Sequence, residues 1–69
     1  MKYLEFVPHK NLETALGRHV SVYREKLVEC RRLPEPVYGI LERSDDVYIL
    51  RKPDRTFVKL EEGEGVFVI

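Results

Sequence analysis

The sequence of 69 residues has one cysteine, no tryptophan, no glutamine and a single asparagine, and its 12 basic residues are balanced by 12 acidic ones. Because Cys30 is alone, no disulfide within the chain stabilises the fold. No stretch approaches the roughly 20 consecutive apolar residues of a membrane span, so we expect no membrane segment. A net charge of zero is unfavourable for a dedicated nucleic-acid binder, whose affinity comes largely from neutralising phosphates.

The few amides contrast with a charged fraction of 35%. Many Glu, Lys and Arg residues with few thermolabile amides are typical of hyperthermophile proteins, so we expect a thermophilic source. The first residues contain no long apolar run, and we therefore expect no signal peptide. One free cysteine without an export signal indicates a cytoplasmic protein.

A chain of this length predicts one domain, residues 1–69. A domain so small buries only about 60% of the surface of its unfolded chain, and its core supplies little stability. Such domains usually gain stability from disulfides, a metal or association. Without a disulfide or a metal-binding pattern, we expect a homo-oligomer.

The stretch Asn11–Leu33 has apolar residues at helical spacing. At about 100° per residue, six of them fall within one narrow stripe. These residues are Leu12, Leu16, Val20, Tyr23, Leu27 and Cys30. Asn11 is a suitable N-cap, and Pro34 disfavours helical geometry at Leu33. The pattern predicts one long amphipathic helix over Asn11–Leu33.

A second interpretation of this stretch stays open. Gly17 costs about 1 kcal/mol relative to alanine inside a helix. The run from His19 to Tyr23 alternates and contains β-branched residues, which favour strands. The alternative is a short helix over residues 10–17 followed by a strand from residue 19.

The rest of the chain is divided into short strands by turn residues. Alternation predicts an N-terminal strand over Lys2–Val7, closed by Pro8. Four further strands are separated by turns rich in Ser, Asp, Pro and Gly. They span Val37–Arg43, Val47–Lys52, Thr56–Glu61 and Val66–Ile69. We predict an α+β fold in which the helix packs on a four-stranded antiparallel meander, with a short helix and a small Sm/SH3-like β-barrel as the alternative.

Two of these strands are apolar on both faces. They are Val47–Leu50 and Val66–Ile69. A sheet with one wet face would alternate cleanly, so the second face must be covered by sheet curvature, by another strand or by a second subunit. We also expect the C-terminal strand to be an edge to which a partner adds a strand.

No constellation of catalytic or metal-binding residues stands out. His9, His19 and Cys30 have no metal-ligand spacing, and we expect Cys30 to be a small buried hydrophobe. Asp45 and Asp46 fit an ordinary turn. Gly63-Glu64-Gly65 is not followed by a helix and therefore does not predict a phosphate site. We expect a protein that is not an enzyme and that has no metal and no cofactor.

The best candidate contact surface is basic. Its residues are Arg51, Lys52, Arg55 and Lys59 around a hairpin tip, with Arg31 and Arg32 at the end of the predicted helix. Tyr38 or Tyr48 would offer a ring on which a base could stack.

Two partial resemblances exist. Gly39, Leu41 and Asp45 have the spacing found in Sm-like RNA-binding proteins, and Gly63–Ile69 resembles the closing strand of that family. This resemblance implies a small barrel in a ring that holds RNA, although Ile49 and Glu62 stand where the family has its RNA-contacting Asn and Arg. Lys2–Pro8 resembles the opening strand of RelE-type toxins, which cut messenger RNA, but the basic and His residues of that family near the C-terminus are absent.

Two functions follow as hypotheses. The first is a small non-enzymatic interaction protein that self-associates through an apolar sheet face or edge and also binds a protein partner. The alternative is a nucleic-acid-binding or regulatory protein that uses the basic residues.

Overall fold

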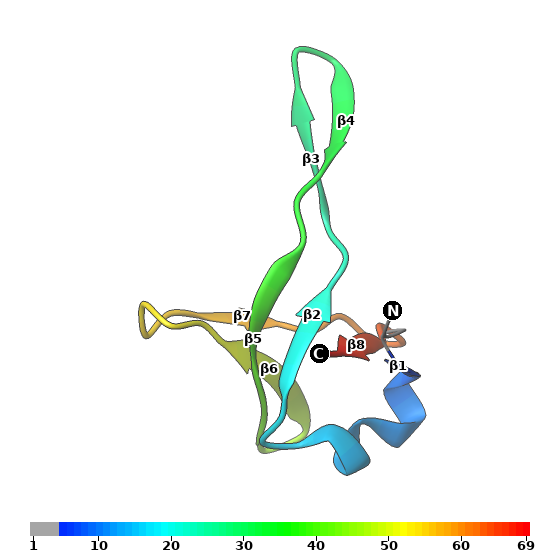
Figure 1. Cartoon of the computed structure of the whole chain (residues 1–69), viewed down its shortest axis with the longest axis vertical. Coiled ribbons are helices and arrows are strands. Elements are labelled where there is room, and N and C mark those ends of the chain that lie inside the picture. Colours follow the sequence, from blue (N-terminus) through cyan, green and yellow to red (C-terminus); the bar gives the residue numbers. More distant parts are fainter. Residues whose placement is uncertain (1–4) are drawn as a thin grey trace.

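The computed structural model describes residues 5–69 (Figure 1). In chain order the elements are β1 (Glu5–Val7), the 3-10 helix η1 (His9–Ala15), β2 (His19–Val22), β3 (Glu25–Val28), β4 (Arg31–Pro34), β5 (Val37–Ser44), β6 (Val47–Arg51), β7 (Phe57–Lys59) and β8 (Val66–Val68). The chain is therefore mostly β, and the predicted α+β architecture is wrong. Lys2, at the start of the predicted first strand, lies outside the described residues.

The predicted helix over Asn11–Leu33 is wrong. Its first part forms η1, which ends at Ala15. Gly17 follows with a φ of 80°, outside the region of a right-handed helix. Strand β2 then begins at His19, in agreement with the second interpretation of a short helix followed by a strand from residue 19.

The alternation in β2 prevails over the helical spacing. Val20 and Val22 are both buried, whereas Leu27 of the expected helical stripe is 70% exposed. Because β-branched residues lose side-chain freedom in a helix but pack well on a sheet, this segment prefers a strand. Cys30 is exposed, so the prediction that it is buried is also wrong.

Six strands form one antiparallel sheet in the order β1-β8-β2-β5-β6-β7, and β3 and β4 pair only with each other. Strands β5, β6 and β7 form a meander, but β8 leaves it and lies between β1 and β2. The predicted four-stranded meander and the C-terminal edge strand are therefore wrong. In the described part of the chain β1 and β7 are the two ends of the sheet and do not pair with each other, so strand pairing does not close it into a barrel.

One face of the sheet carries the core, and η1 packs against it beside β1 and β8. The core residues are Val7, Leu12, Ala15, Val20, Val22, Leu41, Leu50, Leu60, Val66 and Val68. Removing this apolar area from water is the main favourable contribution to folding. The opposite face, here called the outer face, has no covering layer from the described chain.

Gly39 allows β5 to lie close to the backbone of β6. A Cβ atom at this position would lie 2.7 Å from the carbonyl oxygen of Arg51 in β6. No side chain larger than hydrogen fits there, so the close approach of the two strands depends on this glycine.

Strands β3 and β4 form an arm that projects from the body of the molecule (Figure 1). Every residue of both strands is exposed. No helix among residues 5–69 has the length and apolarity needed to cross a membrane.

Candidate functional site on the outer sheet face

The outer face presents a row of residues that crosses four strands. In the strand register Phe6 is paired with Phe67, Phe67 with Ser21, and Ser21 with Tyr38. Directly paired residues point to the same face of a sheet, so these four side chains lie side by side. Phe6 and Tyr38 are 53% and 56% exposed, whereas the small Ser21 between the rings is buried.

A second row runs parallel to the first. His19 is paired with Ile40, Ile40 with Arg51, and Arg51 with Phe57. Ile69 extends the row beyond His19, to whose carbonyl oxygen its N–H donates at 3.0 Å. Phe57 is 61% exposed. The row therefore combines exposed apolar side chains with a histidine and an arginine.

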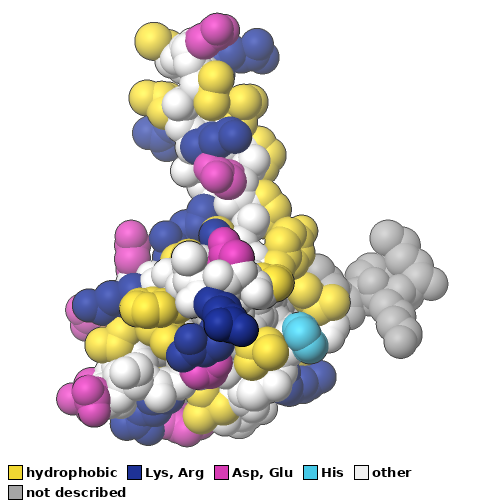
Figure 2. Space-filling model, turned by 90° about the vertical axis from the view of Figure 1, so that its left-hand side faces the viewer, with side chains coloured by type: hydrophobic (Ala, Val, Ile, Leu, Met, Phe, Trp, Pro, Cys, Tyr) yellow, Lys and Arg dark blue, Asp and Glu magenta, His cyan; other side chains and the backbone are white. Residues whose placement is uncertain are grey.

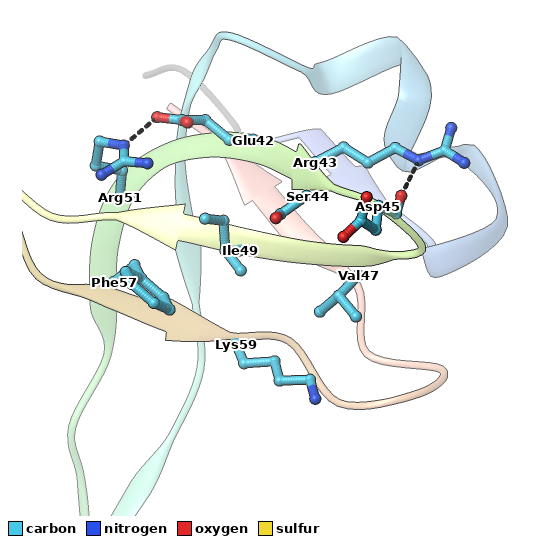
Figure 3. A pocket seen from close by; sticks show the side chains of 9 residues that line it. All are labelled: Glu42, Arg43, Ser44, Asp45, Val47, Ile49, Arg51, Phe57 and Lys59. Atoms are coloured by element: carbon cyan, nitrogen blue, oxygen red, sulfur yellow. Dashed lines mark hydrogen bonds and ion pairs between the residues drawn. The ribbon is translucent and has the colours of Figure 1, made fainter.

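A pocket of about 500 Å³ lies where the outer face reaches β6 and β7 (Figure 3). Its apolar wall consists of Val47, Ile49 and Phe57, and Arg51 and Lys59 stand at its sides. The remaining lining residues are Glu42, Arg43, Ser44 and Asp45. Figure 3 shows Arg43 extending away from Ile49 and Phe57, toward the carbonyl oxygen of Asp45 to which its Nε donates at 2.9 Å.

A second pocket, of about 330 Å³, adjoins the first because Arg51 lines both. Its cationic and titratable side chains are Arg51, Lys52, Arg55 and His19, and its apolar lining is Gly39, Ile40 and Pro53. The two pockets thus form a discontinuous groove across β7, β6, β5 and β2, with Arg51 at the junction.

Ion pairing leaves several of these cations free. Arg51 Nε donates to Glu42 Oε2 at 2.6 Å, and this hydrogen bond raises the pKa of Arg51. Within the described residues Lys52, Arg55 and Lys59 have no side-chain salt bridge. Asp54 lies next to them in sequence, but its carboxylate accepts from Thr56 N–H and Oγ1–H at 3.0 and 2.5 Å. The groove therefore has positive side chains available for an anion.

Figure 2 shows one side of the body, where Lys and Arg side chains lie among hydrophobic and acidic ones and a histidine lies at the edge. The arm above it alternates in charge and is also partly hydrophobic.

The structure brings together four of the six predicted contact residues. Arg51, Lys52, Arg55 and Lys59 line the two pockets. Arg31 and Arg32 lie in β4 on the arm and are not part of this groove. Tyr38 is on the outer face, whereas Tyr48 lies on the opposite face against the core and donates to Glu13 Oε1 at 3.1 Å. This hydrogen bond and, more strongly, desolvation raise the pKa of Tyr48.

His19, Ile49 and Phe57 belong to the groove but were not predicted as contact residues. For His19 the available signal was its place in the alternating run His19–Tyr23, which the helical interpretation obscured. Phe57 and Lys59 are two residues apart, and in a strand this spacing places them on one face.

The described residues offer no obvious metal centre. Between Glu5 and Ile69 no three His, Cys, Asp or Glu side chains are grouped to hold an ion. His9 is half-buried, and its Nδ1 donates to the carbonyl oxygen of Glu64 at 3.0 Å.

The chain matches no family model, no curated protein and no solved structure.

Proposed function

We propose that this protein binds single-stranded nucleic acid along the outer face of its sheet. The observation that carries the proposal is that the strand register places exposed rings on the outer face, where cations line two adjoining pockets. Tyr38 and Phe57 offer rings for stacking, and Lys52, Arg55 and Lys59 offer positive charge in the two adjoining pockets. Sequence-tolerant binding of single strands combines these two elements, a basic groove and aromatic platforms.

The zero net charge of the chain does not oppose this function, because the acidic side chains are mostly placed or paired elsewhere. Glu13 pairs with Arg43, and Glu64 pairs with Arg24. Glu25 and Glu29 are on the arm. The acids that line the two pockets are Glu42, which is bound to Arg51, and Asp45. The pockets are also lined by five Lys and Arg side chains, so positive charge predominates along the groove.

The same charges favour an anionic partner over a second copy at this face. In a face-to-face dimer related by a two-fold axis, the surface around Arg51 and Lys59 would meet an equally basic surface. Juxtaposed like charges cost several kcal/mol at an interface. A polyanion instead neutralises them.

The test is fluorescence anisotropy with labelled single-stranded DNA and RNA of mixed sequence. Binding should weaken steeply between about 50 and 200 mM salt. Replacing Phe57 with alanine removes one stacking ring and should cost about 1–3 kcal/mol of binding free energy. Since Phe57 is largely exposed, the thermal unfolding of this variant should change little.

A matched pair of double variants separates local from overall charge. Lys52→Ala with Arg55→Ala removes two cations from the groove, and Arg31→Ala with Arg32→Ala removes two from the arm. The first should reduce the slope of log K against log salt by about 1.4, at roughly 0.7 for each lost phosphate contact. The second should leave the slope unchanged. The proposal would be refuted if the two double variants changed the salt slope equally, or if the unsubstituted protein did not bind at low salt.

A further inference from the structure

The smaller of the two pockets has a histidine beside its cations. Histidine is the side chain whose charge ordinarily changes between about pH 5 and 8. The sequence contains two histidines, and of these only His19 lines either pocket of the groove. Its side chain is exposed, so a ligand that enters the pocket can reach the imidazole ring. The cations that line the same pocket are Arg51, Lys52 and Arg55.

The strand register places His19 across the sheet from these cations. His19 in β2 is paired with Ile40 in β5, and Ile40 is paired with Arg51 in β6. Directly paired residues point to the same face, so all three side chains project from the outer face. The backbones of β2 and β6 are two strand spacings, about 10 Å, apart. The pocket has a volume of about 330 Å³, which is ample for one phosphate group.

The acidic side chains on the elements around this pocket are already engaged. On β5 the acid of the outer face is Glu42, whose carboxylate accepts from Arg51 Nε at 2.6 Å. In the turn after β6, the Asp54 carboxylate accepts from the N–H and the hydroxyl of Thr56. Neither carboxylate is therefore free to hold a further positive charge in the pocket.

The other neighbours of His19 carry no negative side chain. Beyond β8, the N–H of the apolar Ile69 donates to the His19 carbonyl oxygen at 3.0 Å. On its own strand Arg18 precedes His19, and Ser21 is the next residue on the outer face. No salt bridge of the described chain, to a side chain or to the carboxyl group of Ile69, involves the His19 ring. An anion that holds the protonated ring therefore has to come from a ligand.

We propose that this pocket seats a backbone phosphate of the bound nucleic acid and that His19 contacts the phosphate as the imidazolium. Binding then takes up a proton near neutral pH. This role of His19 rests on the proposed function, because the phosphate belongs to the same nucleic acid. A nearby anion favours the charged form of an imidazole, and hydrogen bonds from a charged donor are about twice as strong as neutral ones. Lys52 and Arg55 supply charge at any pH near neutral, whereas His19 makes the affinity depend on pH.

The probe is a labelled oligothymidylate without a terminal phosphate, titrated with the intact protein in buffers from about pH 6 to about pH 8. Thymine and the phosphodiester do not titrate in this range, so a pH dependence reports on the protein. The affinity at low salt should rise about three- to tenfold as the pH falls, because one added charge pair acts on this scale. The slope of log K against log salt should steepen by about 0.7 at the lower pH, for one further phosphate contact.

A matched pair of substitutions assigns the pH dependence to one ring. His19→Gln keeps a polar side chain that cannot be charged, and it should have the same affinity at both ends of the pH range. His9→Gln is the control, because the ring centroid of His9 lies 5.7 Å from that of Tyr48, on the opposite face of the sheet. This variant should keep the pH dependence of the unsubstituted protein. Persistence of the dependence in His19→Gln, or its equal loss in both variants, would overturn the proposal.

Titration calorimetry gives a second readout on the unsubstituted protein. Near neutral pH the heat of binding should vary with the ionisation enthalpy of the buffer in the direction of proton uptake by the complex. Binding without proton uptake, with equal affinity across the pH series, would overturn the role of His19 and leave the proposed function standing. Absence of binding at low salt throughout the series would overturn both.

Discussion

Arg24 and Glu64 form a bidentate ion pair between the base of the arm and the body of the molecule. Arg24 Nε donates to Glu64 Oε2 at 2.9 Å, and Arg24 Nη2 donates to Glu64 Oε1 at 2.8 Å. Arg24 Nη2 also donates to the carbonyl oxygen of Lys59 at 3.1 Å. The hydrogen bond to Glu64 raises the pKa of Arg24. These contacts join the residue before β3 to β7 and to the loop before β8.

Arg24→Ala should lower the free energy of unfolding by about 2 kcal/mol, because hydrogen bonds to charged groups contribute roughly 1.5–3 kcal/mol. Both side chains are less than a third exposed, so solvent weakens the pair only in part. Arg43→Ala is the matched control, since the pair of Arg43 with Glu13 is about half exposed. It should change the stability by less than about 1 kcal/mol in urea unfolding. Equal effects would show that the geometry at Arg24 has no special importance.

Gly39→Ala should destabilise the protein strongly. The added Cβ would meet the carbonyl oxygen of Arg51 at 2.7 Å, and that backbone is held in β6. Overpacking of this kind costs about 1–3 kcal/mol. Gly63→Ala is a useful comparison, because its Cβ would meet open space and the cost arises only from a φ of 82°. In chemical denaturation, Gly39→Ala should have a lower free energy of unfolding than Gly63→Ala. The free energy of unfolding of Gly63→Ala should fall by about 1–2 kcal/mol relative to the unsubstituted protein.

The second half of the chain was predictable because its turns are marked locally. Strands β5 to β8 lie within two residues of the predicted ranges. The turn that starts at Lys52 is closed by the Arg55 N–H, which donates to the Lys52 carbonyl oxygen at 3.1 Å. Such turns depend on the residues within them. The place of β8 between β1 and β2 depends instead on distant pairings, for which the sequence carries no local sign.

The first half was mispredicted because two periodicities coexist there. Leu12 and Val20 satisfy both the helical stripe and the observed core, so they did not discriminate between the two folds. Gly17 was the informative residue, since its φ of 80° permits the change from η1 to β2. The basic residues of the site were identifiable from their clustering in sequence. His19 and Ile40 could not be assigned to the site, because only the register of β2 with β5 brings them together.

Asp54 should titrate below its ordinary pKa. The hydroxyl of Thr56 is the main cause, followed by the Thr56 N–H, and the charge of Lys52 acts in the same direction. A lowered pKa in the folded state stabilises the fold above the pKa of the unfolded chain, and this contribution is lost as the pH falls through the folded pKa. Carboxyl NMR titration should show the Asp54 pKa rising toward its ordinary value in Thr56→Val. Thr14→Val, whose hydroxyl donates to the Asn11 carbonyl oxygen, should not move it.

Glu42→Gln should increase the affinity for single-stranded nucleic acid. Glu42 holds Arg51 at the junction of the two pockets, and its carboxylate repels phosphate. Without that charge Arg51 is free to contact a phosphate, so the slope of log K against log salt should steepen by about 0.7.

The gain in affinity at low salt should be about three- to tenfold, because one added charge pair at an interface acts on this scale. Glu25→Gln removes the same charge from β3 on the arm, which lines neither pocket of the groove. It should leave both the affinity and the slope unchanged in anisotropy titrations. Because most substitutions in a binding groove weaken binding, a gain confined to Glu42→Gln would identify the outer face directly. A loss of affinity in Glu42→Gln would mean that the ion pair itself shapes the groove for the ligand.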